Sequence, residues 1–191
     1  FSPIKLEKRS QNYFWFLLFL FFSIFIGFRH EVGGDWLHYL WSFSHINDEF
    51  HPLKFSSLKD NYGYNLIAWF FYNNGGNIYL VNFVNALIFM LGLTLYALRQ
   101  NQSLLVFLIA FPYLIIVVAT GYTRQATAIG FIFLGINALT DRKTRLFLLY
   151  LFLATFFHYT AICMVILLLA LSKTRIKFFI YIILIIVLLS I

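Results

Sequence analysis

Residues 78–98 read IYLVNFVNALIFMLGLTLYAL, a stretch without a charged side chain. At about 1.5 Å per residue, a helix of this length reaches about 30 Å, the thickness of the hydrocarbon core of a bilayer. The whole chain agrees, because 62% of its 191 residues are hydrophobic and 11% are charged, whereas soluble domains carry about 25% charged residues. A water-soluble fold is excluded, and the sequence predicts an all-α polytopic membrane protein.

Further apolar runs lie on both sides of this stretch. Run 13–28 resembles a signal peptide, but the Gly-Phe-Arg-His at its end offers no small-residue cleavage site, so we expect a retained helix. Segment 64–72 is too short to cross alone and is expected to be re-entrant or interfacial. The remaining runs are 104–120, 123–140, 146–171 and 178–191. Residues 1–191 are thus expected to form a single membrane domain of about 6–7 transmembrane or partial helices.

The basic residues predict the orientation of these helices. The 14 Lys and Arg residues give a formal net charge of +7 and cluster in short loops between the apolar runs, as in cytoplasmic loops rather than in a nucleic-acid-binding surface. With a cytoplasmic N-terminus and two crossings by 146–171, ten basic residues lie inside and four outside. A single crossing gives seven on each side. Cytoplasmic loops of membrane proteins carry an excess of Lys and Arg, the positive-inside rule. This rule therefore favours two crossings with a turn at His158, and one tilted helix is the alternative.

The polar chemistry is concentrated in a predicted extracytoplasmic loop over residues 29–63, which holds five of the seven acids and four of the five histidines. The histidine spacing matches no zinc motif, so no metal is expected. Aromatic and apolar residues at helical spacing predict an interfacial helix over residues 35–44. Asp35 is expected either to cap this helix or to place a carboxylate at the mouth of a cavity.

Arg124 and His158 are candidate functional residues within the later apolar runs. Thr123 is expected to cap a helix in whose first turn Arg124 lies, and a cation there, together with free N–H groups and the helix dipole, favours a bound anion such as phosphate. Snorkelling of Arg124 to the interface is the alternative. At the depth of His158, ionisable residues face a bundle interior or a wet cavity, and a hydrogen bond to a neighbouring helix is the alternative. Asn82, Asn85 and Asn137 are expected to bond neighbouring helices.

Four short motifs follow one another along the chain. They are FRHEVGGDWLHY at residues 28–39, DNYGYNLI at 60–67, TRQA at 123–126 and FHYTA at 157–161. Together they resemble the motifs of the EpsG family of Wzy-type O-antigen and exopolysaccharide polymerases, in the same order. Gly34, Trp36 and Thr160 stand where the family more often has other residues, and these departures are mild.

The resemblance implies a GT-C-like membrane glycosyltransferase on the outer face of the bacterial cytoplasmic membrane, with its N-terminus in the cytoplasm. It would join polyprenyl-diphosphate-linked oligosaccharide repeat units into O-antigen, capsule or exopolysaccharide. No cofactor is expected, because the diphosphate is already an activated leaving group. The expected partners are the lipid-linked oligosaccharide, the bilayer and other polysaccharide-assembly membrane proteins. Family members extend beyond residue 191, so the chain is expected to be a fragment that lacks C-terminal helices.

The resemblance also implies roles for individual residues. Arg29 and Arg124 would bind the pyrophosphate, and Asp35 or His158 would act as base on the acceptor hydroxyl. Contacts to sugar, or positioning roles, are expected for three further residues, Trp36, Tyr39 and Gln125. The alternatives are a lipid-linked oligosaccharide flippase and a membrane O-acyltransferase of polysaccharides with a histidine base. A flippase would be expected to show related halves, and no internal repeat is visible.

Overall fold

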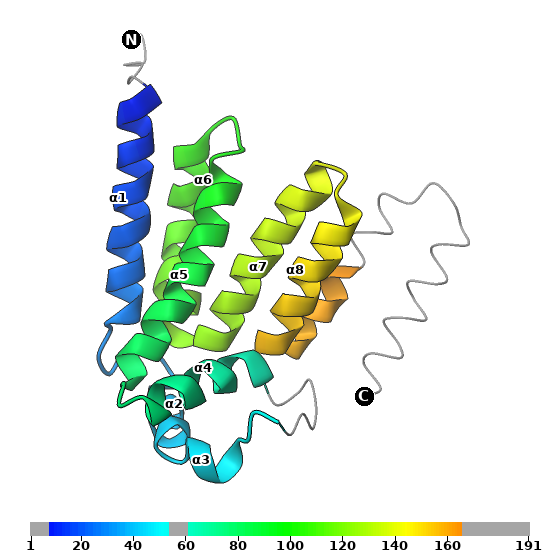
Figure 1. Ribbon diagram of the computed structural model, residues 1–191. Coiled ribbons are helices and arrows are strands. Elements are labelled where there is room, and N and C mark those ends of the chain that lie inside the picture. The colour runs from blue at the N-terminus through cyan, green and yellow to red at the C-terminus, as the bar shows by residue number, and fades with distance from the viewer. Residues whose placement is uncertain (1–7, 54–60, 166–191) are drawn as a thin grey trace, which may run out of the picture.

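The computed structural model describes residues 8–53 and 61–165, and the regular elements of these residues are all helical (Figure 1). Long helices lie side by side as a bundle: α1 (Lys8–Gly27), α5 (Ile78–Ala97), α6 (Ser103–Ala110) with its π-helical continuation η2 (Phe111–Ala119), α7 (Thr123–Thr140) and α8 (Thr144–Phe157). Three shorter helices lie across one end of the bundle, α2 (Trp36–Ser44), α3 (Ile46–Glu49) and α4 (Tyr62–Asn73). The 3-10 helix η3 (Tyr159–Val165) follows α8.

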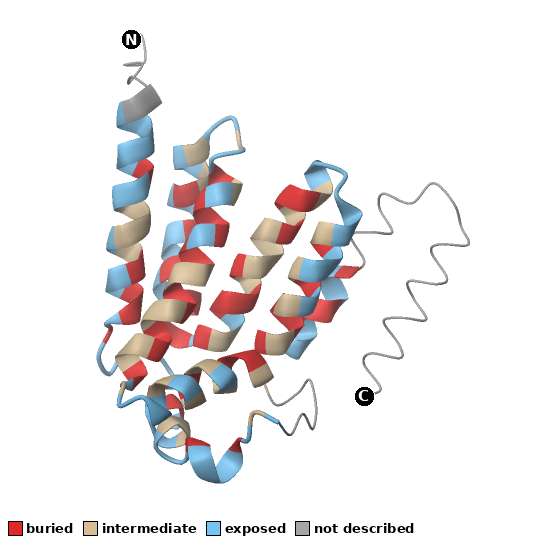
Figure 2. Cartoon of the chain, in the orientation of Figure 1, coloured by how far each residue is buried: buried red, intermediate tan, exposed pale blue. Residues whose placement is uncertain are grey.

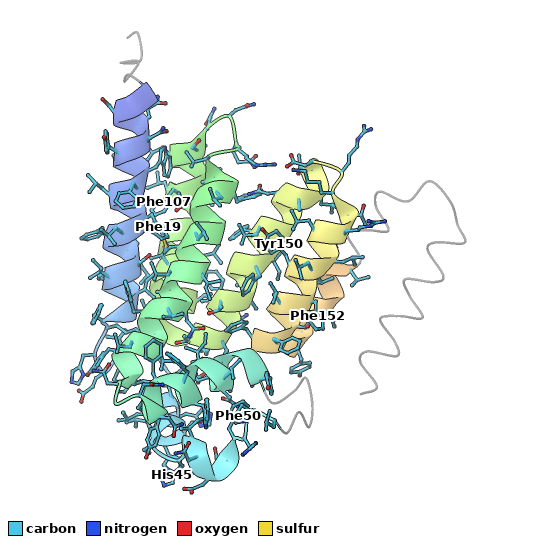
Figure 3. All side chains as sticks on the ribbon, viewed as in Figure 1. Phe19, His45, Phe50, Phe107, Tyr150 and Phe152 are labelled. Carbon is cyan, nitrogen blue, oxygen red and sulfur yellow. The ribbon has the colours of Figure 1, made fainter. Side chains whose placement is uncertain are left out.

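The outer surface of the bundle is apolar. Buried residues gather where the helices face one another (Figure 2), and Phe19 of α1 packs against the same core as Phe107 of α6 (Figure 3). Large apolar side chains are exposed on the outward faces of α1, α6 and α8, including Phe16, Leu17, Phe21, Leu104, Leu108, Ile109, Leu149 and Phe152. A bilayer accepts such a surface, whereas water does not.

Two helical segments of the described residues, Ser10–Gly27 and Ile78–Ala97, are long and apolar enough to cross a membrane. Ser103–Ala119 and Thr144–Phe157 are shorter apolar helices. The all-helical fold class is confirmed, and the number of crossings stays a prediction. The expected helix over residues 178–191 lies outside the described residues.

Helices α5 and α7 approach each other through glycine. A Cβ atom on Gly92 would collide with the backbone oxygen of Gly130, and a Cβ atom on Gly130 would lie 2.7 Å from the backbone oxygen of Ile88. Beside this contact, the Thr127 hydroxyl donates to the side-chain oxygen of Asn85 at 2.7 Å. Small residues let two membrane helices approach, and polar side chains then link them. The interhelical hydrogen bond predicted for Asn85 is confirmed. The one predicted for the Asn137 side chain is not found among the described residues, where the Asn137 backbone carbonyl accepts from Arg99 at 3.0 Å.

The long apolar run 146–171 is interrupted at His158. Helix α8 ends at Phe157, His158 is extended with φ −154° and ψ 109°, and η3 begins at the next residue and packs against α8. The turn predicted at His158 is therefore confirmed. The end of the second arm, from residue 166, lies outside the described residues, so the second crossing stays a prediction.

Polar segments lie at one end of the bundle and basic loops at the other (Figure 1). The segment after α1, the start of α4, the turn before α7 and the end of α8 share the end covered by α2 and α4. At the opposite end, Arg99 donates to both carboxylate oxygens of Asp141 at 2.7 and 3.0 Å, and this bond holds the pKa of Asp141 below its usual range. Helix α4 is a single helix across the bundle end, which fits the interfacial alternative for segment 64–72.

We predict that Gly92→Ala destabilises the protein by about 1–3 kcal/mol, because overpacking would force α5 away from α7. The free energy of unfolding in detergent or lipid nanodiscs measures this effect. Gly121→Ala is the control, since a Cβ atom there would meet nothing within 4 Å. Equal stabilities of the two variants would contradict a tight glycine contact between the helices.

Candidate functional site

A polar cavity of about 160 Å³ lies at the end of the bundle covered by α2 and α4. Its lining comes from four separate parts of the chain: Asp35, Tyr39, Asn61, Tyr122, Arg124, Gln125, His158 and Tyr159. Five of these eight residues belong to the candidates derived from the sequence. The fold therefore brings together segments that are more than a hundred residues apart.

Gly33 docks the segment after α1 onto the turn before α7. Its φ of 101° lies in a region that favours glycine. A Cβ atom there would lie 2.5 Å from the backbone oxygen of Thr120 and 2.7 Å from the Cα atom of Gly121. Because only glycine fits this close approach, Gly33 brings Asp35 to the same cavity as Arg124.

Gly63 makes the second close approach, between α4 and the end of α8. A Cβ atom on Gly63 would lie 2.8 Å from the ring of Phe157, the last residue of α8. The next residue, Tyr64, is 2% exposed, and its ring centroid lies 5.2 Å from that of Tyr39. This packing sets the end of α8, and with it His158, beside the start of α4.

Arg124 is a half-buried cation at the start of α7. Its backbone N–H and its Nε–H both donate to the Tyr39 hydroxyl at 3.4 Å, and its guanidinium carbon lies 5.1 and 5.9 Å from the ring centroids of Tyr39 and Tyr64. In the part of the chain that the structure describes, no carboxylate forms an ion pair with it. A cation without a counter-charge, at the N-terminus of an 18-residue helix, makes the cavity suitable for an anion.

Arg29 is buried beneath the cavity rather than lining it. The side chain is 6% exposed, and it donates to the carbonyl of Ile26 at 2.9 Å and to the hydroxyl of Thr123 at 2.5 Å. Burial lowers the pKa of Arg29 below its usual range, although a guanidinium stays charged at neutral pH. The two arginines thus lie at the same helix start, but only Arg124 reaches the cavity.

The prediction that Thr123 caps α7 is wrong. Tyr122 occupies the cap position, and Thr123 is the first helical residue. Its hydroxyl accepts from Arg29 and donates to the side-chain oxygen of Asn82 at 3.4 Å, so it is not available to the helix N–H groups. One of those N–H groups, that of Arg124, is bound by the Tyr39 hydroxyl instead. The interhelical bond predicted for Asn82 is confirmed.

Asp35 and His158 present to the cavity polar side chains that have no hydrogen-bond partner among the described residues. The helix predicted over 35–44 is found as α2, and Asp35 stands at its cap position, but its side chain makes no capping hydrogen bond. Asp35 therefore occupies the expected cap position but does not cap the helix with its side chain. Its carboxylate lines the cavity instead. The ring of His158 is half-buried and makes no hydrogen bond within the described residues, so the expected alternative of a helix–helix bond is not found there.

Trp36 and Gln125 differ in their placement. Trp36 is 6% exposed and packs its ring 5.9 Å from those of His30 and Tyr79, so it does not line the cavity. Gln125 is exposed and does. Sequence reasoning missed three lining residues, although each lies inside or next to a quoted motif: Asn61, Tyr122 and Tyr159. No group of His, Cys, Asp or Glu in the described residues is arranged to hold a metal ion.

Fold and cavity together define a helical membrane protein with a small cationic site at one end of its bundle. A family model matches residues 12–191, and the chain belongs to the EpsG family. The resemblance seen in the four motifs is thereby confirmed. Membership indicates a polymerase-type membrane protein of exopolysaccharide or O-antigen synthesis. Searches of curated proteins and of solved structures gave no match.

We predict that Gly33→Ala strongly reduces polysaccharide formation, because a Cβ atom would push the segment carrying Asp35 away from the turn before α7. The matched control is Gly34→Ala, where the nearest atom to a Cβ would be the Tyr122 hydroxyl at 3.9 Å. Cellular polysaccharide, compared at equal protein levels, measures the difference. The docking role of Gly33 would be refuted by equal polymer from both variants.

Proposed function

We propose that this chain belongs to a membrane glycosyltransferase that joins polyprenyl-diphosphate-linked oligosaccharide repeat units into a surface polysaccharide. One observation carries the proposal. A half-buried arginine without a carboxylate partner among the described residues, Arg124, shares a cavity with two unpaired groups suited to proton transfer, Asp35 and His158. Family membership supports the same class of reaction.

The cavity suits the diphosphate of the donor. The Nη2 group of Arg124 has no partner in the described part of the chain and can donate to a phosphate oxygen. The Tyr39 hydroxyl accepts from Arg124, so its own proton is free to bind the same anion. A volume of about 160 Å³ is below the roughly 300 Å³ of ordinary ligand pockets. It therefore fits a headgroup, while the lipid and the sugars would extend beyond it.

Charge stabilisation of the leaving group is the proposed catalytic contribution of Arg124. The acceptor hydroxyl oxygen would form a bond to the anomeric carbon of the donor, and the bond from that carbon to the diphosphate oxygen would break. The proton of the acceptor would pass to Asp35 or His158. The diphosphate would leave with an added negative charge, which a guanidinium at a helix N-terminus stabilises.

A different role is proposed for Arg29. Its burial and its hydrogen bond to Thr123 support positioning of the start of α7 rather than direct contact with the diphosphate. This proposal replaces the two-arginine clamp expected from the sequence. Trp36 is buried against Tyr79 and does not line the cavity, so the sugar contact expected for it from the sequence is not part of this proposal.

The proposed orientation places the cavity on the outer face of the bacterial cytoplasmic membrane. The loops and the start of α8 at the opposite end of the bundle carry a cluster of basic residues, Arg99, Arg142, Lys143 and Arg145, and such clusters are typical of the cytoplasmic side. A cavity at the outer face would meet lipid-linked repeat units after their transfer across the membrane.

We predict that Arg124→Ala in the full-length protein abolishes long polymer and leaves single repeat units on the lipid carrier at the outer face. Arg124→Lys should restore only a small part of the activity, because an ammonium lacks the planar fork of a guanidinium. Gel analysis of cell-surface glycans and of the lipid-linked pool measures both. Arg145→Ala, which removes an exposed cation at the other end of the bundle, is the control.

Other outcomes would decide against the proposal. Accumulation of repeat units on the cytoplasmic face alone would indicate a flippase. Normal polymer that lacks only acyl groups would indicate an O-acyltransferase.

We predict that the proton acceptor can be identified by comparing Asp35→Asn with His158→Gln. The variant that removes the base should lower turnover by about 10²–10⁴-fold while donor binding is retained, because the diphosphate contacts remain. Turnover with purified donor in nanodiscs, measured together with donor affinity, tests this. Full turnover by both variants would exclude a base at either position.

A further inference from the structure

Asn61 lies at the polar cavity, immediately before α4. It adopts a left-handed backbone conformation with φ 49° and ψ 46°, which asparagine tolerates better than most residues. Its side chain lines the cavity beside Arg124 and His158. The proposed reaction described above assigns it no role.

One orientation of the Asn61 amide satisfies both of its neighbours. In that orientation the nitrogen donates to the carbonyl of Phe157 at 2.9 Å, and the oxygen accepts from Nη1 of Arg124 at 3.0 Å. The opposite orientation would set the amide oxygen against a carbonyl and the amide nitrogen against an N–H group. The hydrogen-bonding pattern therefore selects the bridging arrangement.

Both bonds reach groups at helix ends. The Phe157 carbonyl belongs to the last residue of α8, and the last carbonyls of a helix have no partner within the helix. Arg124 stands in the first turn of α7. A single amide, which both donates and accepts, thus joins the end of the helix that leads into His158 to the cation of the cavity.

The bridge also restricts how Arg124 can move. Tyr39 accepts from its Nε at 3.4 Å, and Asn61 accepts from its Nη1. Two fixed contacts hold the plane of the guanidinium, and Nη2 is left for a ligand. Preorganised donors lose less entropy and less reorganisation energy when an anion binds.

We propose that Asn61 is a positioning residue of the proposed glycosyl transfer. It holds the guanidinium of Arg124 and the segment carrying His158 at a set separation across the cavity. This inference rests on the proposed function, because it specifies how the same site is organised. A carboxylate at this position would still accept from Arg124, but it would lose the bond to Phe157 and would repel a diphosphate.

The test compares three variants of the full-length protein in lipid nanodiscs, with inorganic diphosphate as the binding probe. Asn61→Gly tolerates the left-handed backbone and removes both hydrogen bonds, and it should weaken diphosphate binding about tenfold. Asn61→Asp should weaken it more, about a hundredfold, because of the added negative charge. Asn74→Gly, the same change at the other end of α4, should bind as the unmodified protein does.

A purely structural role predicts a different result. Glycine also tolerates the left-handed conformation, so if Asn61 only shaped the turn, Asn61→Gly would keep normal affinity and turnover. That result would overturn the proposal. Under the positioning role, turnover at saturating donor should fall in Asn61→Gly as well, about 10- to 100-fold, with an unchanged unfolding midpoint.

Arg124→Ala separates the two levels of inference. If it keeps both diphosphate binding and polymer formation, the proposed function fails, and the role of Asn61 fails with it. If Arg124→Ala loses both while Asn61→Gly behaves normally, the proposed function stands and only the positioning role of Asn61 is refuted.

Discussion

The start of α7 is held by a buried charge, and the cavity depends on it. Arg29 carries a guanidinium into an environment where it is 6% exposed, and a buried charge is costly unless it is hydrogen-bonded. The Ile26 carbonyl and the Thr123 hydroxyl accept from its Nη1 and Nη2 groups, while Nε has no partner among the described residues. Thr123 is bound in turn to Asn82 of α5. The ends of α1 and α7 are therefore linked to each other and to the glycine-packed pair α5 and α7.

Close contacts at two glycines then bring together the segments of the site, which are distant in the sequence. Gly33 lets the first polar segment lie against the turn before α7, and Gly63 lets α4 lie against Phe157. The rings of Tyr39 and Tyr64 then hold the guanidinium of Arg124. Because aromatic rings attract a cation without neutralising it, Arg124 is positioned firmly and still carries a charge that an anion can satisfy.

The small size of the cavity has a functional consequence. If the cavity recognises a diphosphate, it would bind the part that all lipid-linked donors of this kind share. The sugars would be bound at another surface or not be recognised. Specificity for a particular repeat unit would then come from surfaces outside the cavity. Two aromatic residues that line the cavity, Tyr122 and Tyr159, are exposed and would be the first candidates for such a surface within the described residues.

Composition and hydrophobic runs by themselves determined the helical membrane class and the short helix after Asp35, because these follow from local spacing and from the cost of unpaired backbone in a bilayer. The distribution of basic residues favoured the break at His158 over one tilted helix. The four motifs indicated the family and five of the residues that line the cavity. Only the tertiary structure decided that Arg29 and Trp36 do not line the cavity, that Thr123 bonds Arg29 instead of capping α7, and that the Asn61 amide can bridge Arg124 and Phe157. Those assignments depend on which groups from distant segments come close enough to form hydrogen bonds, and the spacing of residues along the chain does not determine that.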